Sequence, residues 1–381
     1  MGKEPHPIAT FDKLIQRLRS LLKLLGLDSY EPNYRPNFRT AIVLCLAALY
    51  VGITMYDLVH FKDDLFNFVY VLITFFFATI GIGRIAIFLT CDDALQFLLA
   101  ETYRTYREAG ADEREQRVLW WYTNIYRWAV RTYARMFVVT GTIMPLIPMV
   151  RFFVTGELVL PFGVVLPFVD VNSGLGYVLN YIYQVSCIVW TAPGLVSSYC
   201  LTLAQVVNIC TQYDLLAVKL TVLEEHILAH DDDLVARKLR HLIRDQQRVE
   251  RFVAKVESTY RLLSGVEVLS LGLQVVITLF VEQFSLWIPG LAVIPLFSGQ
   301  LFIFCALGAA IQHKSESFAA GVYRLSWHEL SRREKQTFRI MLLRSQESQK
   351  LTCVHIHDIN LNLFVAMSQK FYSIFMMLRS I

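Results

Sequence analysis

Residues 65–83 read LFNFVYVLITFFFATIGIG, a run without a charged side chain that is long enough for an α-helix to cross the hydrocarbon core of a bilayer. The chain has 381 residues, of which 55% are hydrophobic and only 18% charged, and this is very apolar for a water-soluble protein. Similar runs with few or no charges occur at 41–56, 136–150, 171–213, 262–281 and 291–312. The sequence therefore predicts an all-α membrane protein and argues against a soluble globular enzyme.

Two of the predicted spans have unusual features. The run 171–213 would reach about 65 Å as one straight helix, so the fourth span should project well beyond the bilayer. The last candidate, 359–378, is more polar and contains Lys370, which suggests a pore-facing or interface position. Glu267 interrupts the fifth span, and we expect it at the cytoplasmic edge. Counting the last helix, we expect seven spans.

The basic residues predict how the chain is oriented. Of the 36 Lys and Arg residues, 31 lie before the first span or between spans two and three, four and five, and six and seven. Segments that stay in the cytoplasm are enriched in Lys and Arg. We therefore expect a cytoplasmic N-terminus and an extracellular C-terminus. The net charge of +4 is small and the basic residues are spread out, which makes nucleic acid a poor partner.

The charged segments show helical periodicity. In 92–130 and 214–260 apolar positions recur at helical spacing among many charges, which predicts that membrane helices continue into a cytoplasmic bundle. Residues 11–25 place their apolar side chains on one face, which suits an interfacial helix on the inner leaflet. The outer connection 155–173 has two apolar stretches with proline, and we expect it to pack as a lid.

No motif in the chain supports enzyme chemistry. HExxH and GxSxG motifs and a Gly-rich phosphate loop are missing, and the acidic run 231–233 lies among charged helical residues. The seven cysteines are mostly isolated in apolar runs without the spacing of metal ligands, as expected of small buried side chains. We expect no catalytic residues, no metal and no cofactor.

The last predicted helix carries a line of polar residues on one face. Asn362, Gln369, Ser373 and Met377 follow at spacings of seven, four and four residues, and Ile381 lies four further on. Several copies of such a helix would build a water-filled pore that ends in a hydrophobic gate. Alternatively, these polar side chains hydrogen-bond to neighbouring helices of the same subunit. The pattern alone slightly favours this second interpretation.

The C-terminal quarter resembles the insect odorant receptors. Its segments GVYRLSWHEL, KQTFRIMLLRSQESQKLTC and INLNLFVAMSQKFYSIFMMLRSI are similar to the signature end of that family. The matching residues are Tyr323, Trp327, Arg344, Ser345, Gln346, Leu361, Phe364, Tyr372, Ser373, Phe375 and Leu378. Ile374 departs from the aromatic residue usually found there, a local change. The inverted seven-span topology and the LLKLLGL sequence near the N-terminus extend the resemblance over nearly the whole chain.

This resemblance implies the odour-tuning subunit of an odorant-gated, nonselective cation channel in the plasma membrane of sensory neuron dendrites. The implied partner is the universal odorant receptor co-receptor, with which the chain would form a heterotetramer. The chain lacks the long insertion between spans four and five that marks the co-receptor itself. The implied ligand is a small volatile odorant.

The resemblance also implies an organisation along the chain. A cytoplasmic segment at 1–38 would precede spans one to six with their cytoplasmic extensions at 39–325. A cytoplasmic anchor helix and turn at 326–356 would lead into a pore-lining last helix at 357–381. The pore and gate residues would be Ser373, Met377 and Ile381.

In this family the odorant pocket lies in the outer half of the bundle, among spans two, three, four and six. Read onto this chain, the candidates are mostly aromatic, with a few hydroxyl and amide groups and no charge. They are Phe68, Val71, Phe75, Phe76, Thr142, Pro145, Met149, Tyr177, Tyr181, Gln184 and Phe297. Such a set suits a small uncharged volatile held by shape and dispersion, although ordinary interhelical packing explains any single member as well.

Two other classes of membrane protein compete with this interpretation. A secondary transporter would also carry polar groups at the midplane of the bilayer, but the odd number of spans and the absence of internal repeats oppose it. A G-protein-coupled receptor has seven spans too, but its orientation is opposite to the one that the basic residues predict.

Overall fold

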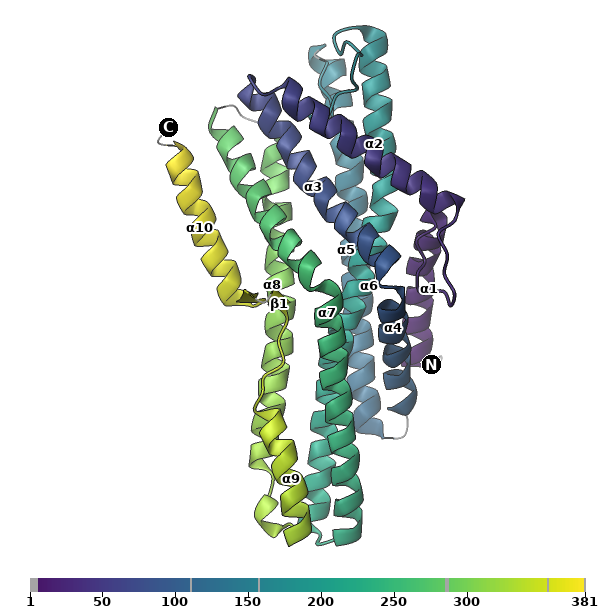
Figure 1. The fold of residues 1–381 in the computed structure, drawn as a ribbon, viewed down its shortest axis with the longest axis vertical. Coiled ribbons are helices and arrows are strands. Elements are labelled where there is room, and N and C mark those ends of the chain that lie inside the picture. The colour runs from purple at the N-terminus through teal and green to yellow at the C-terminus, as the bar shows by residue number, and fades with distance from the viewer. Residues whose placement is uncertain (1–5, 110–111, 157, 285–287, 355, 380–381) are drawn as a thin grey trace.

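The chain is helical almost throughout in this computed structural model, which describes residues 6–109, 112–156, 158–284, 288–354 and 356–379 (Figure 1). The helices are α1 (Pro7–Leu25), α2 (Phe38–His60), α3 (Leu65–Thr90), α4 (Asp92–Glu108), α5 (Glu113–Thr155), α6 (Gly174–Leu228), α7 (Asp232–Phe284), α8 (Ile288–Arg324), α9 (Arg332–Ser345) and α10 (Leu361–Arg379). A short 3-10 helix, η1 (Trp327–Glu329), precedes α9, and the antiparallel strands β1 (Thr352–Cys353) and β2 (His357–Asp358) precede α10.

Among the described residues, six helices are long and apolar enough to cross a membrane, namely α2, α3, α5, α6, α7 and α8. These are the first six predicted spans. The predicted seventh span is α10, which is not among these six; it packs against α7 and α8 and rises beside them in Figure 1. The helices α5, α6 and α7 have 43, 55 and 53 residues, so they extend far beyond a bilayer, as the periodicity of their charged segments predicts.

The helix α1 differs from the expectation for it. It is amphipathic as predicted, but its apolar face packs against α4, α5 and α6 rather than being free to lie on a leaflet. Ile15 and Leu22 are fully buried, and the ring of Phe11 stacks on Tyr106 with 4.7 Å between centroids. An amphipathic pattern requires an apolar partner but does not say whether that partner is lipid or protein. In this protein the partner is not lipid, because the apolar face of α1 packs into the groove between these helices.

The last helix is held by only one of its faces. Leu363 and Phe371 are buried against the bundle, within an apolar cluster that includes residues of α7 and α8. The approach to α7 is close: a Cβ added to Gly272 would lie 1.7 Å from Cζ of Phe371. A residue with any side chain at this position therefore requires the ring of Phe371, or α10 with it, to shift away from α7.

We expect Gly272→Ala to destabilise the purified chain by about 1–3 kcal/mol, the usual cost of overpacking. Thermal unfolding in detergent measures the effect. The matched control is Gly299→Ala in α8, because nothing lies within 4 Å of a Cβ added there. In a Phe371→Ala background the Gly272→Ala penalty should shrink. An equal penalty in both backgrounds would show that the ring of Phe371 does not create the constraint.

Candidate ligand cavity and pore helix

The connection between α5 and α6 forms a packed loop at the end of the bundle opposite α9 (Figure 1). Gln184 accepts from the backbone N of Phe162 at 2.7 Å and donates to the carbonyl of Val164 at 2.6 Å. In the same way Asp57 of α2 accepts from the backbone N of Val165 at 2.7 Å. Gln184 and Asp57 are almost completely buried. Their hydrogen bonds satisfy backbone groups that would otherwise be buried without partners, so the loop is a fixed lid, as predicted.

Beneath this loop lies a cavity of about 400 Å³. It is bounded by the end of α1, by α2, α3, α5, α6 and α8, and by the loop, and its lining is predominantly apolar and aromatic. On α3 the lining residues follow helical spacing, with Ile73, Phe77 and Gly81 in one row. The other main contributors are Tyr50, Tyr70, Thr74, Phe137, Thr140, Gly141, Met144, Phe162, Tyr183, Cys187, Trp190, Leu296, Phe297 and Gln300. This volume and composition are typical of a site for a small organic molecule.

The structure places the candidate ligand residues on the helices that enclose the cavity, but it brings only Phe297 of that set into the lining. Gln184 holds the loop, as described above. The hydroxyls of Tyr177 and Tyr181 donate to the carbonyls of Val159 and Pro145. The remaining candidates outside the lining are Phe68, Val71, Phe75, Phe76, Thr142, Pro145 and Met149.

Sequence reasoning missed several lining residues for identifiable reasons. It did not assign α2 to the pocket, although Tyr50 of this helix lines it. On α3 it chose Phe75 and Phe76 instead of Phe77, the third member of one run of aromatic residues. The spacing of Ile73, Phe77 and Gly81 was a usable signal, because these positions share one face of a helix.

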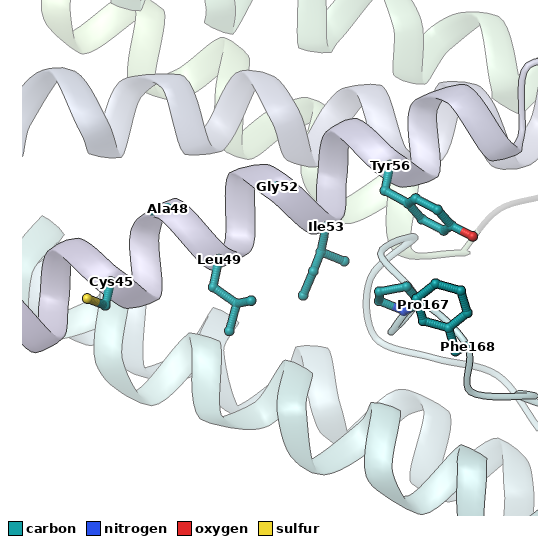
Figure 2. Close-up of a pocket in the computed structure, with 8 residues that line it drawn as sticks. All are labelled: Cys45, Ala48, Leu49, Gly52, Ile53, Tyr56, Pro167 and Phe168. Carbon is teal, nitrogen blue, oxygen red and sulfur yellow. The ribbon is translucent and has the colours of Figure 1, made fainter.

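A second hollow lies beside α2, on its side facing the loop between α5 and α6. Figure 2 shows Leu49 and Ile53 projecting from α2, with Pro167 and Phe168 of the loop beside Tyr56. This groove has a volume of about 600 Å³ and is open to the surroundings. Leu49 lines both the groove and the cavity beneath the loop, so the two spaces adjoin at its side chain.

A buried ion pair lies at the cavity wall. Arg84 of α3 contacts the carboxylate of Glu267 of α7, and the two side chains are 4% and 3% exposed. Arg84 also donates to Oγ of Ser198 at 2.8 Å and lies 3.3 Å above the ring of Tyr199. Arg84 belongs to the lining, so a charged side chain that was not among the sequence candidates borders the cavity. Glu267, expected at the cytoplasmic edge, is enclosed between helices as the partner of Arg84.

The polar line of the last helix is exposed in the single chain. Asn362, Gln369, Ser373 and Met377 all lie on the open surface of α10, as does Lys370. Oγ of Ser373 donates to the carbonyl of Gln369 on its own helix at 2.9 Å. In the part of the chain that the structure describes, these polar side chains make no hydrogen bond to another helix. The predicted gate residue Ile381 lies outside the described residues.

These features define a helical membrane protein with an apolar cavity beneath a packed loop and a peripheral last helix. Residues 93–372 match the family model described as 7tm Odorant receptor, so the chain belongs to the 7tm odorant receptor family. It is 21% identical to the putative odorant receptor 83c of Drosophila melanogaster, over 99% of each chain. It is 26% identical to odorant receptor 10 of Aedes albopictus over 241 residues, which are 60% of this chain and 62% of the relative.

Two solved structures share the fold. The insect olfactory receptor OR5 from Machilis hrabei in complex with eugenol superposes with a TM-score of 0.80 at 14% identity, over 98% of this chain and 99% of that one. The structure of the same receptor described without a ligand gives a TM-score of 0.74 at 14% identity, over 97% and 98% of the two chains. The all-α architecture with seven membrane helices is therefore that of an insect olfactory receptor.

We expect Gly81→Leu to fill part of the cavity, because Gly81 lines it and nothing lies within 4 Å of a Cβ added there. The half-activating concentration should rise about tenfold or more for the largest ligands and less for smaller ones, since a lost contact or a clash worth 1.4 kcal/mol changes affinity tenfold. Dose-response curves for a series of graded size measure this. Gly299→Leu is the control, because Gly299 also faces open space but does not line the cavity. An equal shift in both variants would place the ligand elsewhere.

Proposed function

We propose that this chain is the odorant-binding subunit of an odorant-gated, nonselective cation channel. The observation that carries the proposal is the apolar cavity under a tightly held loop. Membership of the odorant receptor family supports it, as does the fold shared with an olfactory receptor that was solved with eugenol. A transporter or a G-protein-coupled receptor finds no comparable support.

The ligand that fits this cavity is a small, uncharged volatile molecule of mainly apolar or aromatic character. Phe77, Phe137, Trp190 and Phe297 supply large apolar surfaces to it. Aromatic walls hold such a ligand by dispersion and shape. A few hydroxyl and amide groups, such as that of Gln300, provide for one hydrogen bond. A charged odorant would have to lose its hydration in this apolar space, which is costly.

The channel requires several subunits, and we propose the odorant receptor co-receptor as the partner in a heterotetramer. The exposed polar line on α10 supports this, because Asn362, Gln369 and Ser373 have no partner helix in the described part of the chain. In an assembly this face would line a central pore. Met377, which is 59% exposed, would form this subunit's share of a hydrophobic gate, together with Ile381.

The orientation and location of the chain also belong to the proposal. The basic helix α9 and the turn between α6 and α7 lie at one end of the bundle, and α10 runs toward the other end (Figure 1). The positive-inside rule then puts the N-terminus in the cytoplasm and the C-terminus outside. We place the protein in the plasma membrane of sensory neuron dendrites.

An epitope tag on the C-terminus should be labelled by antibody in intact cells, and a tag on the N-terminus should be labelled only after permeabilisation. This pattern follows from seven spans with basic segments in the cytoplasm. Microscopy or flow cytometry of both tagged forms measures it. Labelling of the N-terminal tag alone in intact cells would contradict the orientation and with it the channel proposal.

We expect Met377→Ser to raise the current that flows without odorant. A ring of apolar side chains excludes water from a closed pore, and a hydroxyl lowers this barrier. Patch-clamp recording with the co-receptor measures the resting current, and other subunits keep the effect partial. Met376→Ser is the matched control, because Met376 is exposed on a neighbouring face of the same helix. If both variants show wild-type resting current at normal surface abundance, α10 does not line the gate.

A further inference from the structure

The helix α7 stands between the ligand cavity and the last helix. It packs on one side against α3, which carries a row of cavity-lining residues, and on another against α10 and β1. One apolar cluster joins the cavity residues Ile73 and Phe297 to Leu271 of α7 and Phe371 of α10. The structure therefore contains a continuous packed path from the cavity wall to α10.

Polar contacts fix α7 to the segment that leads into α10. The carboxylate of Glu257 accepts from the backbone N of Thr352 at 3.0 Å and also contacts its hydroxyl. Two turns further along α7, Sγ of Cys353 donates to the carbonyl of Ser264 at 3.8 Å. A shift of α7 along or about its axis is thus passed to β1 and to the start of α10.

On the cavity side, the corresponding fixed point is the ion pair of Arg84 and Glu267. Glu267 lies between Ser264 and Gly272, a stretch of α7 only about 12 Å long. This short stretch of α7 therefore contacts the cavity wall through Glu267. It contacts β1 through Ser264 and α10 through Gly272. Both side chains of this ion pair are less than 5% exposed.

The folding stability of the chain does not explain why an ion pair is buried at this place. Removing two charges from water costs several kcal/mol per ion, and apolar residues of similar volume are often as stable or more stable. Ionisable residues at membrane depth accordingly tend to serve a function. A buried pair does specify position, because each charge is satisfied only in one arrangement of the two helices.

We propose that the Arg84/Glu267 pair is the positioning element through which occupancy of the cavity acts on α10. This rests on the proposed function, which puts the odorant in the cavity and the gate on α10. A ligand in the cavity touches the wall that contains Arg84, and Arg84 holds Glu267. The ligand favours the arrangement of α3 and α7 that it contacts best, and α7 passes this arrangement to α10. Neither residue needs to touch the ions that flow.

The test removes the pair without leaving a buried charge unpaired. The variants are Arg84→Gln/Glu267→Gln, which is neutral, and Arg84→Glu/Glu267→Arg, which restores a pair in reversed order. The control is Lys219→Gln/Asp245→Asn, which removes the 2.7 Å ion pair between α6 and α7 in the charged end of the bundle, away from the cavity lining. Each full-length chain is expressed with the co-receptor, and its surface abundance, half-activating concentration and ratio of saturating to resting current are measured.

We expect the neutral variant to reach the surface like wild type and to lose at least about fivefold in the current ratio, the lower end of typical coupling between sites. The reversed pair should recover most of this loss, and the control should match wild type. A wild-type ratio in the neutral variant would overturn the proposal. So would a loss that the reversed pair does not recover, because the effect would then belong to the single groups. Loss of the neutral variant from the surface would reduce the pair to a structural role and overturn it as well.

This experiment separates the coupling proposal from the proposed function. If wild type gives odorant currents and Gly81→Leu shifts the half-activating concentration, the cavity binds odorant whatever the pair variants do. If wild type gives no odorant current with the co-receptor, the proposed function itself fails. Only the ratio of saturating to resting current, at matched surface abundance, decides the role of the pair.

Discussion

The packing of α7 is the contact on which the rest of the structure depends. Helices α3, α6, α8 and α10 all pack against it, and 56% of the residues in its most apolar window are buried, compared with 17% for α2. A helix enclosed in this way is shielded from lipid, so it can carry Glu267 at membrane depth, provided that a partner such as Arg84 faces it. The outer helices α2 and α5 face the surroundings and bear mostly apolar side chains.

The sequence predicts the first six spans because a run of about 20 apolar residues with few or no charges is typical of a membrane-spanning helix. It predicts that the polar residues of α10 share one face, because spacings of four and seven repeat on one side of a helix, but it slightly favours hydrogen bonds to neighbouring helices over the exposure that this face has in the structure. It does not reveal which face of α3 meets the cavity, since Phe75, Phe76 and Phe77 are chemically identical and differ only in direction. The pairing of Arg84 with Glu267 is also hidden, because the two residues are far apart in the chain and meet only after folding.

A buried amide side chain can hydrogen-bond either to a ligand or to the protein backbone, and the polar residues near the loop show the second case. Gln184 was a reasonable candidate for an odorant contact, but its amide is occupied by the backbone of Phe162 and Val164. Asn180 similarly accepts from the backbone N of Leu166 at 2.7 Å. A loop that packs onto apolar helices brings unpaired backbone groups with it, and these buried side chains satisfy them. These polar groups thus serve largely to hold the loop over the cavity, whose lining is predominantly apolar.

The loop over the cavity has a consequence for timing. A ligand beneath the loop is covered on that side, so its residence time depends on how often the loop or a helix gap opens as well as on the strength of its contacts. The hydrogen bonds of Gln184, Asn180 and Asp57 to the loop set part of the barrier to such opening. Two receptors with identical cavity walls but different hydrogen bonds to the loop would therefore rank the same odorants in the same order of affinity. The odorants would nevertheless dissociate from them at different rates, so the responses would end at different rates.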